Sequence, residues 1–153
     1  MTLSRNARLM AGITILIVPT IMYGGWTLLG ILTHGSVAAS SGPRLNETQW
    51  ALWRAGHAHA GVWTILSVLL QVLLDSTRLS RGLTWLARIC APLSAVVFSG
   101  ALFGLAFSGS FVNYLGIVLM LIALLTTGVG LLRGLGRRDR SPRTGGRILR
   151  TPA

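Results

Sequence analysis

The sequence contains no lysine, a single cysteine and only three acidic residues. Because one cysteine cannot pair within its own chain, Cys90 excludes an intramolecular disulfide and any multi-cysteine metal site. Charged residues make up 11% of the 153 residues, whereas soluble domains carry about a quarter. With 52% hydrophobic residues and a mean hydropathy of +0.65, this composition is typical of a protein whose solvent is lipid.

Catalytic motifs are missing as well. The chain has no nucleophile elbow, phosphate-binding loop, dinucleotide fingerprint or zinc-protease motif. No carboxylate lies within an apolar run, which argues against hydrolysis by paired acids and against the small four-helix drug exporters, which are built around an intramembrane glutamate. No internal repeat of the inverted-topology kind is present. The chain is therefore not expected to be an enzyme on its own.

Four apolar runs are present, and each is long enough to cross a hydrocarbon core as a helix at about 1.5 Å per residue. Backbone groups in lipid must be paired within their segment, and a barrel would show alternating strands of about ten residues. We therefore predict an all-α fold, a four-helix transmembrane bundle over 1–133 with a basic, disordered tail over 134–153. The predicted spans are 10–33, 52–74, 85–107 and 111–132.

The net charge of +11 comes from fourteen arginines, which are distributed unevenly about the predicted spans. Only Arg44 and Arg54 fall on one side of a four-span topology, and the other twelve fall on the opposite side. By the positive-inside rule both termini are then cytoplasmic, in a multi-pass protein of the plasma membrane. Because the arginines flank apolar runs, the charge indicates topology, and no nucleic-acid partner is expected. The tail is expected to bind anionic lipid.

The N-terminus allows a second interpretation. Arg5, Arg8, an apolar run and the tripeptide at 37–39 (Val-Ala-Ala) resemble a secretory signal with its cleavage site. Cleavage would leave three spans and remove His34. The apolar run is longer than the usual signal core of about 7–15 residues, which favours a retained first span. Pro19 within that span is expected to kink the helix.

A few polar residues predict local features of the bundle. Asn46 or Thr48 is expected to cap the second helix. Gln71 is expected to form an interhelical hydrogen bond. Asp75, at the end of the same helix, is expected to form a solvated ion pair with Arg78.

Two of the three histidines lie in residues 54–61 (RAGHAHAG), near the start of the second span. At 3.6 residues per turn, His57 and His59 point to roughly opposite sides of one helix, so a straight helix does not direct both rings at one ligand. His34 ends the first span on the same side of the membrane, where it is expected to approach one of them. The polar face of the first span consists of Tyr23, Thr27, Gly30 and His34.

Three histidines at one membrane depth are open to three interpretations. The first is a cofactor: a b-type haem with axial His34 and His57 and with Arg54 paired to a propionate, or a copper or zinc ion held by His34, His57 and His59. The second is proton or ion handling along a transport path. The third is a set of interfacial histidines that bind no cofactor. Within the motif, His57 is the better candidate ligand and His59 the better candidate for an interface position.

Residues 54–61 resemble a Gly-His-Ala-His-Ala-Gly motif in small four-span membrane proteins of high-GC bacteria, a group without an assigned activity. The lysine-free composition fits that source, and the resemblance implies the bacterial inner membrane. The same stretch is distantly similar to the second helix of haem–copper oxidases and nitric oxide reductases, in which an outer-side histidine binds haem. The chain has far fewer spans than that family and lacks a recognisable set of copper-binding histidines, so no activity carries over. The likeness only favours haem among the cofactors.

The sequence thus predicts an integral membrane protein with an outer-side histidine cluster, which would be an electron-transfer or accessory subunit if it binds haem or a metal. The alternatives are a cofactor-free structural or assembly subunit and a small oligomeric transporter. Four helices bury little surface, so the expected partners are the lipid bilayer and either further copies of the chain or other membrane subunits. Gly100 and Gly104 form a small-xxx-small pair that is expected to pack closely against a neighbouring helix.

Overall fold

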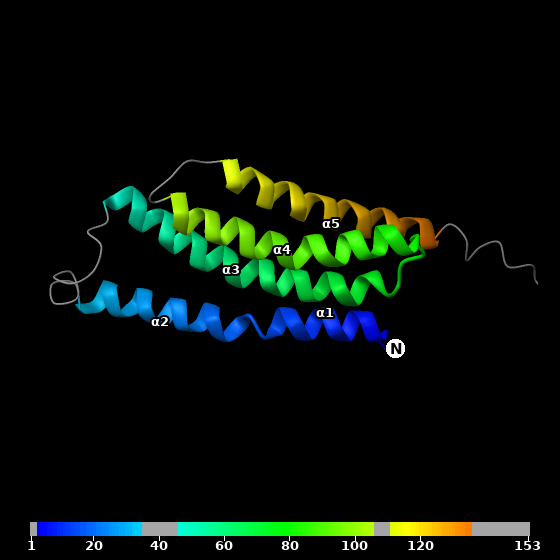
Figure 1. Ribbon diagram of the computed structural model, residues 1–153, viewed down its shortest axis with the longest axis horizontal. Coiled ribbons are helices and arrows are strands. Elements are labelled where there is room, and N and C mark those ends of the chain that lie inside the picture. The colour runs from blue at the N-terminus through cyan, green and yellow to red at the C-terminus, as the bar shows by residue number, and fades with distance from the viewer. Residues whose placement is uncertain (1–2, 35–45, 106–110, 136–153) are drawn as a thin grey trace, which may run out of the picture.

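The computed structural model describes residues 3–34, 46–105 and 111–135, and within these ranges the regular structure is helical, with no strand (Figure 1). The helices are α1 (Arg5–Ile15), α2 (Val18–His34), α3 (Glu47–Leu74), α4 (Arg81–Leu105) and α5 (Phe111–Leu135). Four segments are long and apolar enough to cross a membrane: Arg5–Gly30, Glu47–Leu74, Arg81–Gly104 and Phe111–Leu135. The predicted all-α fold with four potential membrane spans is confirmed.

The first predicted span consists of two helices rather than one. α1 and α2 are separated by Leu16 and Ile17, and Pro19 lies in the first turn of α2. Proline has no N–H to continue the helical ladder, and its ring clashes with the carbonyl four residues earlier, that of Ile15. The Ile17 N–H bonds to the Thr14 carbonyl at 3.2 Å, a tighter turn that closes α1. The effect expected of Pro19 is therefore confirmed as an interruption of the span.

α3 begins at Glu47 rather than at residue 52, because Asn46 caps it. The Asn46 Oδ1 accepts the Gln49 N–H at 2.9 Å, and the Gln49 Oε1 accepts the Asn46 N–H at 2.9 Å. This reciprocal capping box satisfies two N–H groups that the first turn of a helix leaves open. Of the two predicted caps, Asn46 is the one used, and Thr48 lies within the first turn.

The helices pack in an order that leaves the first span at the edge. α3 packs against α4 and α4 against α5, while α1 and α2 pack mainly on α3. In Figure 1, α1 and α2 follow one another along one side of the bundle, and α5 lies on the other side. Only 11% of the most apolar window of the first span is buried, against 56% for the span of α4. α4 is therefore the most enclosed of the four spans, and α1–α2 the most peripheral.

Glycines set the distance between neighbouring helices at two places. A Cβ on Gly116 of α5 would lie 2.7 Å from the Phe98 Cβ and 2.8 Å from the Phe98 Cα and N, so α4 and α5 touch through their backbones there. A Cβ on Gly56 of α3 would lie 3.2 Å from the ring of Phe103 on α4. The predicted packing pair, Gly100 and Gly104, is different, because a Cβ on either would meet nothing within 4 Å.

A buried ion pair joins α3 to α4 at the end of the bundle that holds the start of α1, the α3–α4 connection and the end of α5. The side chain of Arg88 on α4 is 4% exposed and donates to the Asp75 Oδ1, at the cap of α3. The guanidinium also donates to the Gln71 Oε1 at 3.2 Å, and the Gln71 Nε2 donates to the Arg88 carbonyl at 2.9 Å. The interhelical hydrogen bond predicted for Gln71 is confirmed.

The Asp75 carboxylate also accepts hydrogen bonds from the N-terminal segment. The Ser4 N–H donates to the Asp75 Oδ2 at 2.6 Å, and the Ser4 hydroxyl donates to the Asp75 Oδ1 at 2.7 Å. The predicted pair of Asp75 with Arg78 is wrong, since a buried guanidinium needs a counter-ion whereas the exposed Arg78 is solvated. Burial alone would raise the pKa of the Asp75 carboxyl, but the hydrogen bonds from Ser4 and the guanidinium of Arg88 together hold it below its usual value.

Candidate functional site

His57 lies on the face of α3 that packs against α2. A Cβ on Gly25 would lie 2.7 Å from both the Cε1 and the Nε2 of the His57 ring, and 3.6 Å from its Nδ1. The Cε1–Nε2 edge of the ring therefore faces the α2 backbone, in a space that only glycine leaves open. The backbone of α2 at Gly25 therefore restricts the approach of a ligand to the Nε2 of His57.

His59 lies on the opposite side of α3, against α4. Its Nδ1 is 2.7 Å from the Ala55 carbonyl oxygen. Because a carbonyl only accepts, this hydrogen bond requires a proton on Nδ1, and in the tautomer with that proton alone the lone pair lies on Nε2. The ring centroid lies 5.1 Å from that of Phe98 on α4 and 6.3 Å from that of Trp63, in edge-to-face geometry. Trp63 and Phe98 stack on each other at 4.2 Å, so His59 belongs to an aromatic cluster between α3 and α4.

The two histidines of the motif thus serve different neighbours. His57 contacts α2 and His59 contacts α4, as the two-residue spacing on a 3.6-residue turn predicts. The prediction that the motif splits over two faces is confirmed. As they stand, the two rings do not converge on one ligand.

The other two residues proposed for the site are less closely placed. His34 is the last residue of α2, and its side chain lies outside the part of the chain that the structure describes. It follows Gly25 by nine residues, a rise of about 13 Å along the helix. Arg54 lies one turn before His57 and is exposed. Ligation of haem or a metal by His34 stays a prediction, and the described side chains bring no three His, Cys, Asp or Glu residues together at a metal-binding distance.

Two residues of the polar face predicted for the first span, Tyr23 and Thr27, point away from the rest of the bundle. Tyr23 is 68% exposed, and Thr27 is exposed with its hydroxyl donating to the Tyr23 carbonyl at 2.5 Å. A Cβ on Gly24 would meet nothing within 4 Å. The outer face of α2, as we call it below, consists of Thr20, Tyr23, Gly24 and Thr27, which recur at helical spacing.

Two further polar atoms lie between the helices. The Ser99 Oγ and the Asn113 Oδ1 are buried and have no hydrogen-bond partner within the described ranges. The composition of α5 draws attention to Asn113, a rare amide in an apolar helix. Ser99 gives no such signal, because serine is common in close-packed membrane helices.

Comparison with known proteins gives no match to a protein-family model, to a curated protein or to a solved structure. The resemblance of residues 54–61 to a motif of small bacterial membrane proteins stays a prediction. A function for this chain is therefore inferred from the arrangement of α2, α3 and α4.

Proposed function

We propose that the chain is a structural subunit of a membrane assembly, and that the outer face of α2 binds a second copy of the chain. The proposal rests on the outer face of α2, which is a polar surface on an otherwise apolar helix. Tyr23 is 68% exposed and lies seven residues inside the Gly30 end of the first span, a rise of about 10 Å. A polar group at this depth is costly to leave in hydrocarbon, and a second helix can satisfy it.

A second copy suits this face because the face is self-complementary. Thr20 and Gly24 form a small-xxx-small pair, which lets two backbones approach closely. The Thr27 hydroxyl donates to the Tyr23 carbonyl and can still accept, while the Tyr23 hydroxyl can donate, so one face carries both halves of an interhelical hydrogen bond. A two-fold axis beside α2 would bring the same patch of both copies together. The peripheral position of α1–α2 leaves room for such an approach.

The histidines have an internal role in this proposal. The contact of His57 with Gly25 holds α2 at a fixed distance from α3, and His59 joins α3 to α4 through Phe98. Both act by packing, and neither requires a cofactor. The subunit then presents α2 to its partner from a defined position.

The substitution Gly24→Leu tests the proposal, because it places a branched side chain where the two helices would meet. Two differently tagged copies are expressed in one membrane, and the fraction that co-purifies in detergent is measured across dilution. We expect the wild-type chain to self-associate and Gly24→Leu to weaken association about tenfold. Gly12→Leu is the matched control, since Gly12 lies on α1 of the same span and a Cβ there also meets nothing within 4 Å. A monomeric wild-type chain, or equal losses in both variants, would overturn the proposal.

A second candidate function is an electron-transfer or accessory subunit with haem or a metal, and the hydrogen bond of His59 favours it. Metal-ligating histidines usually donate their other ring N–H to a carbonyl or carboxylate, as His59 does to Ala55. His59 rather than His57 is then the ligand, since α2 covers the Nε2 of His57. The purified protein should show a Soret band or about one bound copper or zinc per chain. The signal should be lost in His59→Ala and kept in His57→Ala; a signal absent from the wild type, or kept in both variants, contradicts this function.

A further inference from the structure

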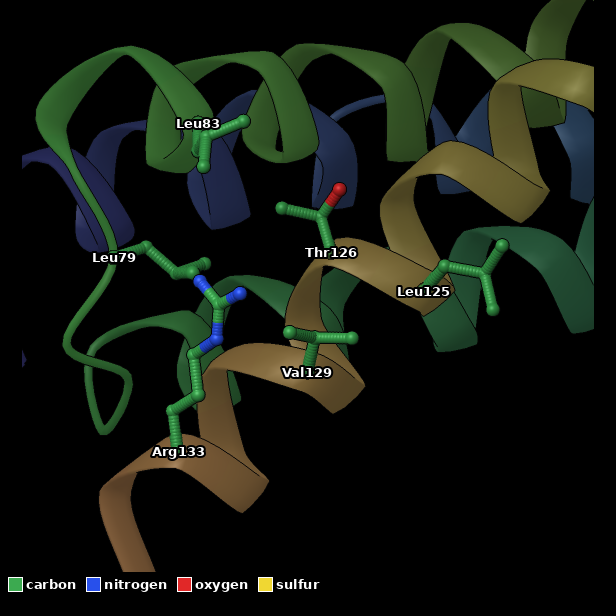
Figure 2. A pocket seen from close by; sticks show the side chains of 6 residues that line it. All are labelled: Leu79, Leu83, Leu125, Thr126, Val129 and Arg133. Carbon is green, nitrogen blue, oxygen red and sulfur yellow. The ribbon is translucent and has the colours of Figure 1, made fainter. Parts of the chain in front are cut away.

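A groove opens at the end of the bundle that carries Arg88 and the start of α1. It has a volume of about 270 Å³ and lies between the α3–α4 connection, the first turn of α4 and the last turns of α5. Figure 2 shows its apolar side chains around the hollow, with the guanidinium of Arg133 reaching across toward Leu79. The residues that line this Arg133 groove are Leu79, Leu83, Leu125, Thr126, Val129 and Arg133.

One wall of the groove is built by a close contact of the α3–α4 connection with α5. A Cβ on Gly130 would lie 2.8 Å from the Leu79 Cγ and 2.9 Å from the Thr77 Cβ, so the connection sits directly on the α5 backbone. The Thr77 hydroxyl donates to the Leu74 carbonyl at 2.8 Å, which fixes the turn that follows α3. The position of Leu79 is therefore determined by packing.

The rim of the groove carries positive charge without a matching carboxylate. Arg133 lines the groove, and the exposed Arg78 and Arg81 flank Leu79 and Ser80 in the sequence. Within the described ranges, the ion pair of Asp75 with Arg88 is the only one formed. The local field therefore favours an anion.

We infer that the Arg133 groove binds an anionic phospholipid, with the phosphate at Arg133 and an acyl chain along Leu83, Leu125 and Val129. Leu125 and Arg133 are eight residues apart, a rise of about 12 Å, so the groove leads from the end of α5 into the apolar part of the span. Basic pockets between helices at the cytoplasmic boundary are typical sites for anionic lipid headgroups. A free phosphate would use the guanidinium alone, and the apolar walls would have no function. This inference does not depend on the proposed self-association.

Arg133 also has a role that needs no lipid. It lies in the last turn of α5, where a positive side chain interacts favourably with the negative end of the helix dipole. Replacing it can therefore loosen the helix end. The test needs a readout that reports on the lipid itself.

The experiment is native mass spectrometry of the full chain, released from an uncharged detergent with phosphatidylglycerol and phosphatidylcholine of identical acyl chains in equal amounts. We expect the wild type to retain phosphatidylglycerol preferentially and Arg133→Gln to lower that preference about fivefold. Arg133→Lys should keep most of it. Arg8→Gln is the matched control, because it removes the same charge from an exposed position on α1 at the same end of the bundle.

A second pair of variants tests the apolar walls at unchanged charge. Val129→Trp fills the groove and should reduce retention of phosphatidylglycerol, whereas Val118→Trp, at a similarly exposed position on α5, should not. Glycerol phosphate, a headgroup without acyl chains, should fail to displace the lipid. Equal losses in Arg133→Gln and Arg8→Gln, or displacement by glycerol phosphate, would overturn the inference.

Discussion

Gly116→Ala is expected to destabilise the protein by about 1–3 kcal/mol, although alanine is the better helix former. The added methyl group would lie 2.7 Å from the Phe98 Cβ and 2.8 Å from the Phe98 Cα and N, and backbone atoms cannot rotate away as a side chain end can. α4 and α5 must therefore move apart. Because Phe98 also stacks on Trp63 and meets His59, the displacement should reach the aromatic cluster between α3 and α4.

Thermal unfolding in detergent, followed by circular dichroism, measures this effect. Gly128→Ala is the matched control on the same helix, since a Cβ at Gly128 meets nothing within 4 Å. That change should be neutral or stabilise the protein by up to about 1 kcal/mol through helix propensity. Tryptophan fluorescence should change in Gly116→Ala and not in Gly128→Ala. If both variants unfold at the wild-type temperature, the backbone contact of α4 with α5 is not as described.

Asp75→Ala is expected to cost about 3 kcal/mol of unfolding free energy, because it leaves the buried guanidinium of Arg88 without a counter-ion. The same change removes both hydrogen bonds from Ser4, so the N-terminal segment should be released as well. Unfolding temperature and the rate of proteolysis before α1 measure the two effects separately. Combining Asp75→Ala with Arg88→Met should recover much of the loss, since the unpaired charge is then absent. A double variant no more stable than Asp75→Ala would contradict this account.

Lowering the pH should destabilise the protein through the same carboxyl group, that of Asp75. The folded protein holds the pKa of Asp75 below its usual value, so the carboxylate binds its proton more weakly when folded than when unfolded. Its contribution to stability is then complete above about pH 4 and is lost as the pH falls through the lowered pKa. The acid limb of a stability–pH profile should accordingly flatten in Asp75→Asn, with Glu47→Gln as the control at the solvated start of α3.

The all-α fold and the four apolar spans followed from the sequence because hydropathy and backbone hydrogen bonding leave few alternatives in lipid. The Asn46 cap and the break at Pro19 are also local effects of single residues. The pairing of helices was not predictable in the same way. Gly100 and Gly104 have the spacing of a packing pair and face open space, whereas Gly116, with no such spacing, meets the backbone of Phe98. Which face of an apolar helix is covered depends on its neighbours.

In the histidine motif, too, the local geometry was predictable and the contacts with other helices were not. The two-residue spacing was sufficient to send His57 and His59 to different faces of α3, because helical geometry is local. The spacing alone does not predict that the Nε2 of His57 lies against Gly25, or that the Nδ1 of His59 donates to the Ala55 carbonyl. The partner of Asp75 was mispredicted for a related reason. Sequence distance favours Arg78, while the cost of burying the charge on Arg88 decides the pairing.

The break between α1 and α2 divides the first span into two helices that are anchored separately. Ser4 anchors the start of α1 on Asp75, and the contact of Gly25 with His57 anchors α2 on α3. The regular helix is interrupted at Leu16 and Ile17, so the two anchors do not depend on one continuous helix. A helix that docks on α2 therefore meets a segment whose position is set at His57 and not at the anchorage of the N-terminus.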